Sequence, residues 1–239
     1  MDDSTTGSPA CNICGGDEFK PGPNGRLAAG GKLPQCRRCR SLERHRILRR
    51  IYERFPGEFL AARDCLQFSQ DMAVSPSWFR SHTVSIYGGE NHLDLMAIAR
   101  PSASCGFIVC NHVLEHVPDD RVAFSELLRI LAPQGVLQFS TPIYIEQAIT
   151  RELRAADTAD HGHYRYYGAD IMERLRSSAL YYCRILEIVE ADPVTSAEGR
   201  AYLVTRGAAV SEQIEGFVSG VIVRRLPPGM KHAREAVFS

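Results

Sequence analysis

A strand, a helix and a second strand follow one another within residues 106–140, and this alternation constrains the fold more than any other feature of the sequence. The runs GFIVC (106–110) and GVLQFS (135–140) are short and apolar, which is typical of buried strands. Between them, DDRVAFSELLRIL (119–131) places apolar residues at helical spacing and ends at the helix breaker APQG. Because strands alternate with helices, the sequence predicts an α/β fold with a mostly parallel sheet covered on both faces.

Further runs extend this pattern on both sides of the segment. SLERHRILRRIYERF (41–55) and GADIMERLRSSA (168–179) indicate helices, and Ser41 is the expected N-cap of the first. Strands are expected at residues 62–68, 82–87, 181–191 and 201–206. In sheets of this class a ligand binds in the crevice at the carboxyl ends of the strands. Functional residues are therefore expected directly after the strands.

Four of the eight cysteines form two C-x-x-C pairs near the start of the chain, and 21 residues separate the pairs. Two such turns complete a tetrahedral zinc site, so the metal ligands are predicted to be Cys11, Cys14, Cys36 and Cys39. A redox motif is the alternative interpretation. Residues 11–40 hold too few apolar side chains to fold unaided, which favours metal binding. A site with four protein ligands is structural rather than catalytic.

Charge is distributed unevenly along a chain whose net charge is zero. Residues 20–54 carry eleven Lys and Arg against two Glu. This basic run could pair with acids of the main domain, or bind RNA, a phosphorylated ligand or an acidic carrier protein. Phe19 is the only aromatic residue before Tyr52, which disfavours base stacking, so a small-molecule acceptor is favoured over nucleic acid.

Two later segments carry a family resemblance. NHVLEHV (111–117), the helix that follows it and STP (140–142) resemble the second half of class I S-adenosylmethionine-dependent methyltransferases. HGHYRYYGADIMERL (161–175) is similar to a segment of bacterial relatives that carry an N-terminal zinc ribbon. The resemblance implies a Rossmann-like seven-stranded sheet with helices on both faces, S-adenosylmethionine as cofactor and a structural Zn²⁺.

The resemblance also implies a set of site residues. The cofactor is expected to contact the turn after the first strand, an acid at the end of a third strand, and the residues after the fourth strand. These cofactor-binding residues are Phe68, Ser69, Gln70, Glu90, Asp94, Leu95, Asn111 and His112. The turn after the first strand contains no glycine, although family members use glycine there to let the backbone approach the cofactor. Ser69 and Gln70 are expected to bind the methionine moiety through their side chains instead.

Histidines dominate the candidate chemistry, because a neutral imidazole accepts a proton near pH 7. The expected catalytic residues are His112, His116 and His163. The substrate-binding residues are expected to be His161, His163, Tyr164 and Arg165, on a loop that can cover the acceptor. A second metal site is disfavoured, because only His112 and His116 stand four residues apart and both precede the helix.

The sequence thus divides into a disordered N-terminus (1–10), a zinc ribbon (11–40), a connecting helix (41–57), a Rossmann-like domain (58–207) and a C-terminal extension (208–239). The extension is predicted to add a helix or strand, with a homodimer contact as one role. No run approaches the roughly 18 apolar residues of a membrane span, and no secretory signal is visible, so a soluble cytoplasmic protein is expected.

Three functions remain open at this level. The first is methyl transfer to O, N or C of a small metabolite, such as a natural-product or glycan intermediate. The second is rRNA or tRNA methylation that uses the basic zinc ribbon. The third is a non-methylating protein on the same scaffold, which the glycine-free turn suggests.

Overall fold

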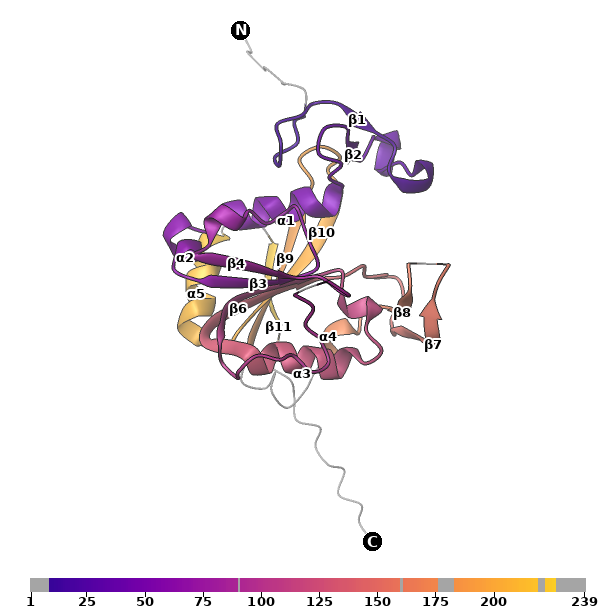
Figure 1. Cartoon of the computed structure of the whole chain (residues 1–239). Coiled ribbons are helices and arrows are strands. Elements are labelled where there is room, and N and C mark those ends of the chain that lie inside the picture. Colours follow the sequence, from indigo (N-terminus) through magenta and orange to yellow (C-terminus); the bar gives the residue numbers. More distant parts are fainter. Residues whose placement is uncertain (1–8, 90, 160, 176–182, 219–221, 227–239) are drawn as a thin grey trace.

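Seven strands form one mixed sheet at the centre of the chain (Figure 1). The computed structural model describes residues 9–89, 91–159, 161–175, 183–218 and 222–226. The sheet order is β11-β9-β10-β6-β5-β3-β4. The strands are β3 (Asp64–Phe68), β4 (Ser81–Ser85), β5 (Cys105–Asn111), β6 (Leu131–Ser140), β9 (Arg184–Ala191), β10 (Glu198–Thr205) and β11 (Ile222–Leu226). Strands β4, β3, β5 and β6 pair in parallel, and β10, β9 and β11 continue the sheet through antiparallel pairs.

Helices cover both faces of the sheet, as Figure 1 shows. Helices α1 (Glu43–Glu53), α2 (Gly57–Ala61) and α5 (Ala208–Phe217) pack on one face. Helices α3 (Asp120–Ile130) and α4 (Ile171–Arg174) pack on the other. The arrangement is the Rossmann-like α/β fold with a seven-stranded sheet that the sequence predicts.

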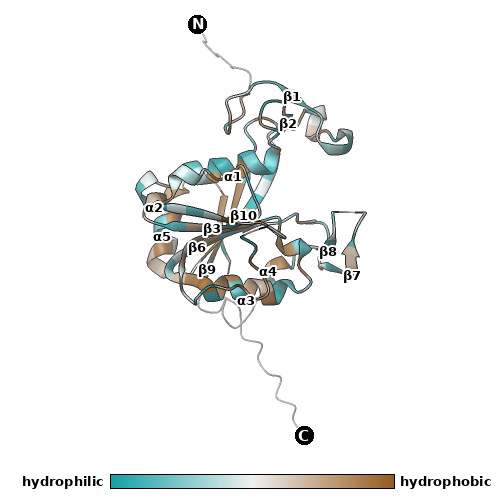
Figure 2. Cartoon of the chain, viewed as in Figure 1, coloured by the Kyte–Doolittle hydropathy of each residue, from teal (hydrophilic) through white to brown (hydrophobic). Residues whose placement is uncertain are grey.

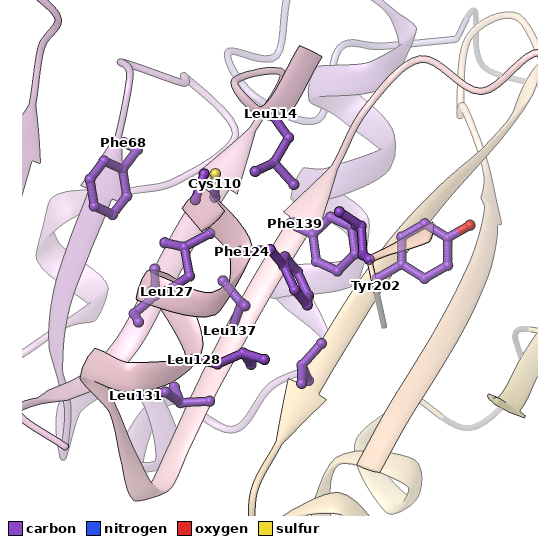
Figure 3. Packing of buried hydrophobic residues seen from close by; sticks show 14 of the residues in the cluster. Phe68, Cys110, Leu114, Phe124, Leu127, Leu128, Leu131, Leu137, Phe139 and Tyr202 are labelled. Atoms are coloured by element: carbon purple, nitrogen blue, oxygen red, sulfur yellow. The ribbon is translucent and has the colours of Figure 1, made fainter. Parts of the chain in front are cut away.

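Alternation along the strands divides the core into two clusters. In β5, Ile108 and Cys110 face α3, whereas Phe107 and Val109 face α1. This is the period-two pattern of a strand that is buried on both faces. Figure 3 shows the α3-side cluster, in which Phe124 packs edge-on against Phe139. In Figure 2 the central strands such as β9 and β10 are mostly hydrophobic, whereas α1 and the N-terminal module are mostly hydrophilic.

The start of α1 differs from the expectation. The N-cap is Leu42 rather than Ser41, and the backbone N–H of Leu42 donates to Nδ1 of His45 at 3.0 Å. The Ser41 hydroxyl instead contacts the sulfur atoms of Cys11 and Cys39, each at 3.2 Å. Ser41 therefore serves the cysteine cluster, and the imidazole takes over the capping position.

The third strand of the family pattern is a second difference. Residues 91–99 form turns and loop rather than a strand, so the expectation that Asp94 ends a strand beside β4 is wrong. The Leu93 N–H donates to the Ser85 hydroxyl at 2.9 Å, which ties this loop to the end of β4. The sheet still has seven strands because β11 is added at the opposite edge.

Two small modules flank the sheet. The first, residues 11–40, contains β1 (Phe19–Lys20), β2 (Gln35–Cys36) and two 3₁₀ turns, Pro23–Gly25 and Ala29–Gly31. The second is the antiparallel pair β7 (Arg151–Asp157) and β8 (His163–Tyr166), which projects to one side in Figure 1. Strand β8 contacts the 3₁₀ turn η4 (Leu114–His116), which follows β5. Within the sheet domain, a further 3₁₀ turn (Pro76–Trp78) lies between β3 and β4.

The C-terminal segment is built into the sheet domain as far as it is described. Val210 and Ile214 of α5 belong to the α1-side core, and β11 pairs with β9. The disorder expected for residues 1–10 falls mainly on residues outside the described part of the chain, as does the stretch 227–239 of the extension. Among the described residues, every helix is too short or too polar to cross a lipid bilayer.

Candidate functional site

The carboxyl ends of β3 and β5 carry two strained residues. Ser69 (φ 64°) and His112 (φ 52°) both adopt the left-handed backbone conformation directly after their strands. For a residue with a Cβ this conformation costs about 1–2 kcal/mol. The Ser69 N–H donates to Ser85 O at 2.9 Å and the His112 N–H donates to Ser140 O at 2.8 Å, so both turns are held by neighbouring strands. Such strain collects where a backbone is shaped for a ligand.

Asn111 ends β5 at the centre of a buried polar network. Its amide nitrogen donates to Asp71 Oδ2 and to Gln138 Oε1, both at 3.1 Å. Its amide oxygen accepts hydrogen bonds from Gln138 Nε2 and from the Ser140 hydroxyl, both at 2.8 Å. Both the nitrogen and the oxygen of the Asn111 amide are bonded to protein groups, so this side chain holds the ends of β5 and β6 together. It also holds the Asp71 carboxylate beside this edge of the sheet.

The predicted cofactor residues lie at different depths. Phe68 and Leu95 are buried in the α3-side core. Ser69 and Gln70 are exposed after β3. The Asp94 carboxylate accepts a hydrogen bond from the Met96 N–H at 2.9 Å and so shapes its own turn. Glu90 lies outside the described residues.

Two exposed apolar residues follow β4 on the same edge, and no sequence pattern singles them out. Ile86 is 49% exposed and Tyr87 is 91% exposed. The Tyr87 ring lies edge-on to His92, with 5.0 Å between ring centroids. Parallel pairing of β4 with β3 brings this apolar surface to the same edge as the Ser69 turn.

The His112 ring and the Glu115 carboxylate lie against each other just after β5. Nδ1 of His112 lies 3.5 Å from Glu115 Oε1, and the Thr141 hydroxyl donates to Glu115 Oε2 at 3.0 Å. Burial opposes ionisation of Glu115, yet the hydrogen bond and positive charge of His112 hold the pKa of this carboxyl below its usual range. A carboxylate on Nδ1 fixes the imidazole and leaves Nε2 as the proton acceptor.

The other predicted histidines gather beside this pair. The rings of His116 and His163 meet at 62° with 4.7 Å between centroids, and His161 lies 6.2 Å from His163. Burial lowers the pKa of His116 below its ordinary value. Tyr164, between the two ends of β8, is half-buried. The structure thus brings His112, His116 and His163 to one region, although His163 comes from a segment about 50 residues further along the chain.

Arg165 has a different place from the one the resemblance implies. It is 1% exposed, and its guanidinium donates to the carbonyls of Leu114, Val117 and Pro118 at 2.7–2.8 Å. These carbonyls belong to η4 and the turn after it. Arg165 therefore braces the turn that carries Glu115 and His116, and its guanidinium points into protein.

A cleft of about 420 Å³ opens beside His112. Its walls are the start of α1, the end of β6 with the loop after it, the start of β10 and one residue of the cysteine module. The lining residues are Arg26, Leu42, Glu43, Arg44, Ile47, Leu48, His112, Ser140, Thr141, Pro142, Ile143, Ala197, Glu198, Gly199 and Arg200. The cleft has the size of a small-molecule site.

Three arginines line this cleft, and two of them are neutralised. Arg26 makes a two-fold ion pair with Glu43 at 2.9 and 2.7 Å, and Arg200 lies 3.3 Å from Glu187. Arg44 forms no ion pair or hydrogen bond with any residue in the described part of the chain. Its side chain is exposed, and partial burial of the guanidinium lowers its pKa against the opposing charges of Asp71 and Glu43. The cleft therefore offers a cation to a ligand.

The four ribbon cysteines converge as the spacing predicts. Their sulfur atoms all lie within 4.8 Å of one another, with 3.7 Å between Cys11 and Cys39 and 3.6 Å between Cys14 and Cys36. Zn–S bonds of about 2.3 Å at tetrahedral angles place sulfur atoms about 3.8 Å apart. The thiol set and its geometry therefore fit a structural zinc ion.

Sequence reasoning missed most of the cleft. Arg26, Glu43, Arg44 and Arg200 come from three segments that only the packing of α1 against β10 brings together. The basic run was visible in the sequence, but nothing there distinguished Arg44 from its paired neighbours. The strained backbone at His112 likewise has no sequence signal.

Comparison with known proteins gives a family match. A family model described as a methyltransferase domain matches residues 43–179, which is 137 of the 239 residues. None of the curated proteins compared with the chain matches it.

Several solved structures are similar at low identity. The 4+2-cyclase SpnF is 15% identical, with 75% of this chain and 80% of that chain covered and a TM-score of 0.41. The YcgJ protein of Bacillus subtilis is 14% identical (70% and 80% covered, TM-score 0.39). The 1,6-didemethyltoxoflavin-N1-methyltransferase of Burkholderia thailandensis is 15% identical (64% and 76% covered, TM-score 0.42). All three TM-scores are below 0.5, so we draw no functional conclusion from these likenesses.

Proposed function

The chain belongs to the methyltransferase domain family, and from this premise we propose that it transfers a methyl group from S-adenosylmethionine to a small anionic acceptor. The acceptor would bind in the cleft between α1, β6 and β10, and the acceptor atom would be O, N or C. One observation carries the proposal: His112 lies both in the wall of this cleft and at the carboxyl edge of β5. A side chain at that position can contact both a cofactor at the strand edge and an acceptor in the cleft.

The residues at the strand edge fit the cofactor. Ser69 adopts the left-handed backbone conformation that glycine readily adopts, so the turn can follow the path that glycine allows in other family members. The exposed Ser69 and Gln70 side chains supply hydrogen bonds for the methionine carboxylate. The Asp71 carboxylate matches the methionine ammonium group. Ile86 and Tyr87 offer an apolar surface for the adenine ring. When bound, S-adenosylmethionine supplies an activated methyl group on a sulfonium.

His112 would act as the base for an O–H or N–H acceptor. Methyl transfer releases the proton of the acceptor atom, and a positioned imidazole that takes this proton accelerates the reaction. The Glu115 carboxylate on Nδ1 stabilises the imidazolium that forms, and Thr141 holds the carboxylate in place. His112 is therefore proposed as the catalytic residue, while Glu115 is a positioning residue.

Arg44 indicates the class of acceptor. An exposed guanidinium that forms no hydrogen bond or ion pair with a described residue can bind a carboxylate or phosphate of the ligand. Leu42, Ile47 and Leu48 supply an apolar wall on the same side of the cleft. An acceptor with an apolar body and one anionic group fits this lining.

Several arginines of the basic run serve the fold, which weakens the case for an RNA substrate. Arg46 is buried and makes a two-fold ion pair with Asp192 at 2.7 and 2.9 Å. Arg50 and Arg54 both pair with Glu190. Arg49 lies over the Trp78 ring at 4.5 Å. The arginines left for a polyanion are mainly those of the ribbon, so we rank nucleic acid second.

The zinc ribbon is proposed to be structural. It contributes Arg26 to the cleft and holds α1 through Arg46, whose guanidinium donates to Pro34 O at 2.9 Å. The thiols of its cysteines fit a reducing compartment, which supports a cytoplasmic location. A homodimer stays a prediction.

Hydrogen-exchange mass spectrometry with S-adenosylhomocysteine tests the cofactor site without any knowledge of the acceptor. Binding should slow amide exchange in residues 69–74, 86–89 and 111–113, because these segments form the strand edge. The ribbon serves as an internal reference and should not change. Protection confined to the cleft, or no protection in a folded protein, would contradict the proposed cofactor site.

A further inference from the structure

Three metal-ligating side chains meet beside the His112–Glu115 pair, away from the zinc ribbon. Glu115 and His116 come from η4, and His163 comes from β8. One carboxylate oxygen and one nitrogen of each imidazole all lie within 4.8 Å of one another. The proposed methyl transfer needs neither His116 nor His163, so their convergence has no explanation in that reaction.

Protein groups orient two of these three side chains. The Thr141 hydroxyl donates to Glu115 Oε2 at 3.0 Å. The His116 imidazole interacts with the backbone of Gly162 and packs against the His163 ring. Such outer contacts fix the tautomer of a ligating histidine.

The turn that carries two of the ligands is itself braced. Arg165 donates to the carbonyls of Leu114 and Val117, which flank Glu115 and His116. Arg165 and His163 both lie on β8. The same strand therefore supplies the third ligand and clamps the turn that holds the other two.

We propose that Glu115, His116 and His163 bind one divalent first-row transition-metal ion. Two imidazoles and one carboxylate form a ligand set that suits Zn²⁺, Fe²⁺, Co²⁺ or Mn²⁺. Ligand atoms around such an ion stand roughly 3.0–3.4 Å apart, since the bonds are about 2.1 Å long. Side-chain rotation therefore has to close the cluster by up to about 1.5 Å. Three protein ligands leave positions open for water or an oxygen of a small molecule.

The site is compatible with the other roles of Glu115. A carboxylate offers about four lone-pair positions, so one oxygen can ligate a metal while the group still accepts from Thr141 and faces His112. The ribbon thiolates form a separate site with sulfur ligands only. The two sites are therefore distinguishable by spectroscopy.

Cobalt titration of the zinc-loaded protein tests the proposal. We expect one Co²⁺ to bind per chain in addition to the ribbon zinc, with visible d–d absorption bands and no sulfur-to-cobalt charge-transfer band. His163→Gln and His116→Ala should each weaken this binding at least about 10-fold. His92→Gln removes an exposed histidine from another loop and should leave it unchanged.

Each alternative outcome has a clear meaning. If the wild-type protein binds no cobalt beyond the ribbon, or if His163→Gln binds it as tightly as wild type, the proposal is wrong. Ribbon zinc content and circular dichroism verify that each variant is folded. His163 lies on the projecting β7–β8 pair, so its variant remains informative even if His116→Ala misfolds. None of these readouts depends on methyl transfer.

Discussion

His112 concentrates three features in one residue: a left-handed backbone, a place in the cleft wall and a carboxylate on Nδ1. The strain at His112 costs about 1–2 kcal/mol, and the hydrogen bond from its N–H to Ser140 O holds the turn in place. The neighbouring Asn111 has no such freedom, since protein groups occupy its whole amide. Asn111 and His112, at the end of β5 and directly after it, thus separate into a group that positions and a group that reacts.

Substitution of His112 tests this division. His112→Gln removes the base but keeps a polar side chain, so we expect kcat for an O–H or N–H acceptor to fall about 10²–10⁴-fold. The dissociation constant of S-adenosylhomocysteine, measured by calorimetry, should stay within a few-fold of wild type. His82→Gln, at the start of β4 and so at the opposite end of that strand from the cofactor edge, is the matched control and should leave both values unchanged. An unaltered kcat in His112→Gln would remove His112 from the mechanism.

At the scale of single elements, α1 lines the cleft, contacts the ribbon and packs on the sheet. Its first turn is capped by the imidazole of His45, which must be neutral to accept from the Leu42 N–H. Burial lowers the pKa of His45 to about 4, against an opposing effect of Asp71 and with an added effect of the Arg44 charge. The cap is thus present at neutral pH.

This cap predicts how the free energy of unfolding depends on pH. The unfolded chain binds a proton on His45 below about pH 6.5, whereas the folded chain binds it only near pH 4. The contribution of His45 is therefore complete above pH 6.5 and is lost as pH falls toward 4. His45→Asn keeps an acceptor at that position without titrating, so its urea-unfolding free energy should fall less over this range. Equal losses in both proteins would contradict the capping role.

The buried arginine of α1 gives a second prediction at this scale. Arg46→Ala leaves the buried Asp192 carboxylate without its partner, and this should lower the free energy of unfolding by about 3–5 kcal/mol. Arg50→Ala is the matched control on the same helix, because its ion pair with Glu190 is longer (3.5 Å) and more exposed. It should cost at most about 1 kcal/mol. Similar losses in both variants, measured by urea titration, would argue against the buried pair.

At the scale of the whole molecule, the ribbon and the sheet domain should lose stability together when zinc is removed. The ribbon cannot form a core of its own, and it contacts α1 through Arg26, Arg46 and Ser41. We expect chelation, or Cys36→Ser, to lower the Tm of the sheet domain in circular dichroism. Cys65→Ser changes a buried cysteine outside the ribbon and should leave the ribbon zinc in place. An unchanged Tm after verified zinc loss would show that the ribbon is energetically independent.

Much of the architecture could be predicted from the sequence because its elements are strongly periodic. Strands β5 and β6 and helix α3 coincide with the predicted runs to within a few residues. The cap of α1 could not be predicted, because the hydroxyl of Ser41 is claimed by sulfur atoms that come from another module. The strand expected before Asp94 is absent. That expectation came from the family pattern and not from the strand propensity of the residues themselves.

The candidate site was predictable only in part, for a similar reason. His112 could be selected because it directly follows a strand. The role of Arg44 depends on which of its neighbours find partners, and the approach of His163 to His116 depends on how β8 packs on η4. These are properties of tertiary contacts between distant segments, and periodicity does not record them.

Calorimetric titration of the zinc-loaded protein with S-adenosylmethionine and S-adenosylhomocysteine tests the central claim most directly. The account predicts that both ligands bind with a stoichiometry of one per chain, because the Ser69 turn replaces the missing glycines. If neither ligand produces binding heat at several temperatures in a protein shown to be folded, the strand edge does not hold this cofactor. The proposed methyl transfer would then be wrong, whatever the fold shares with its family.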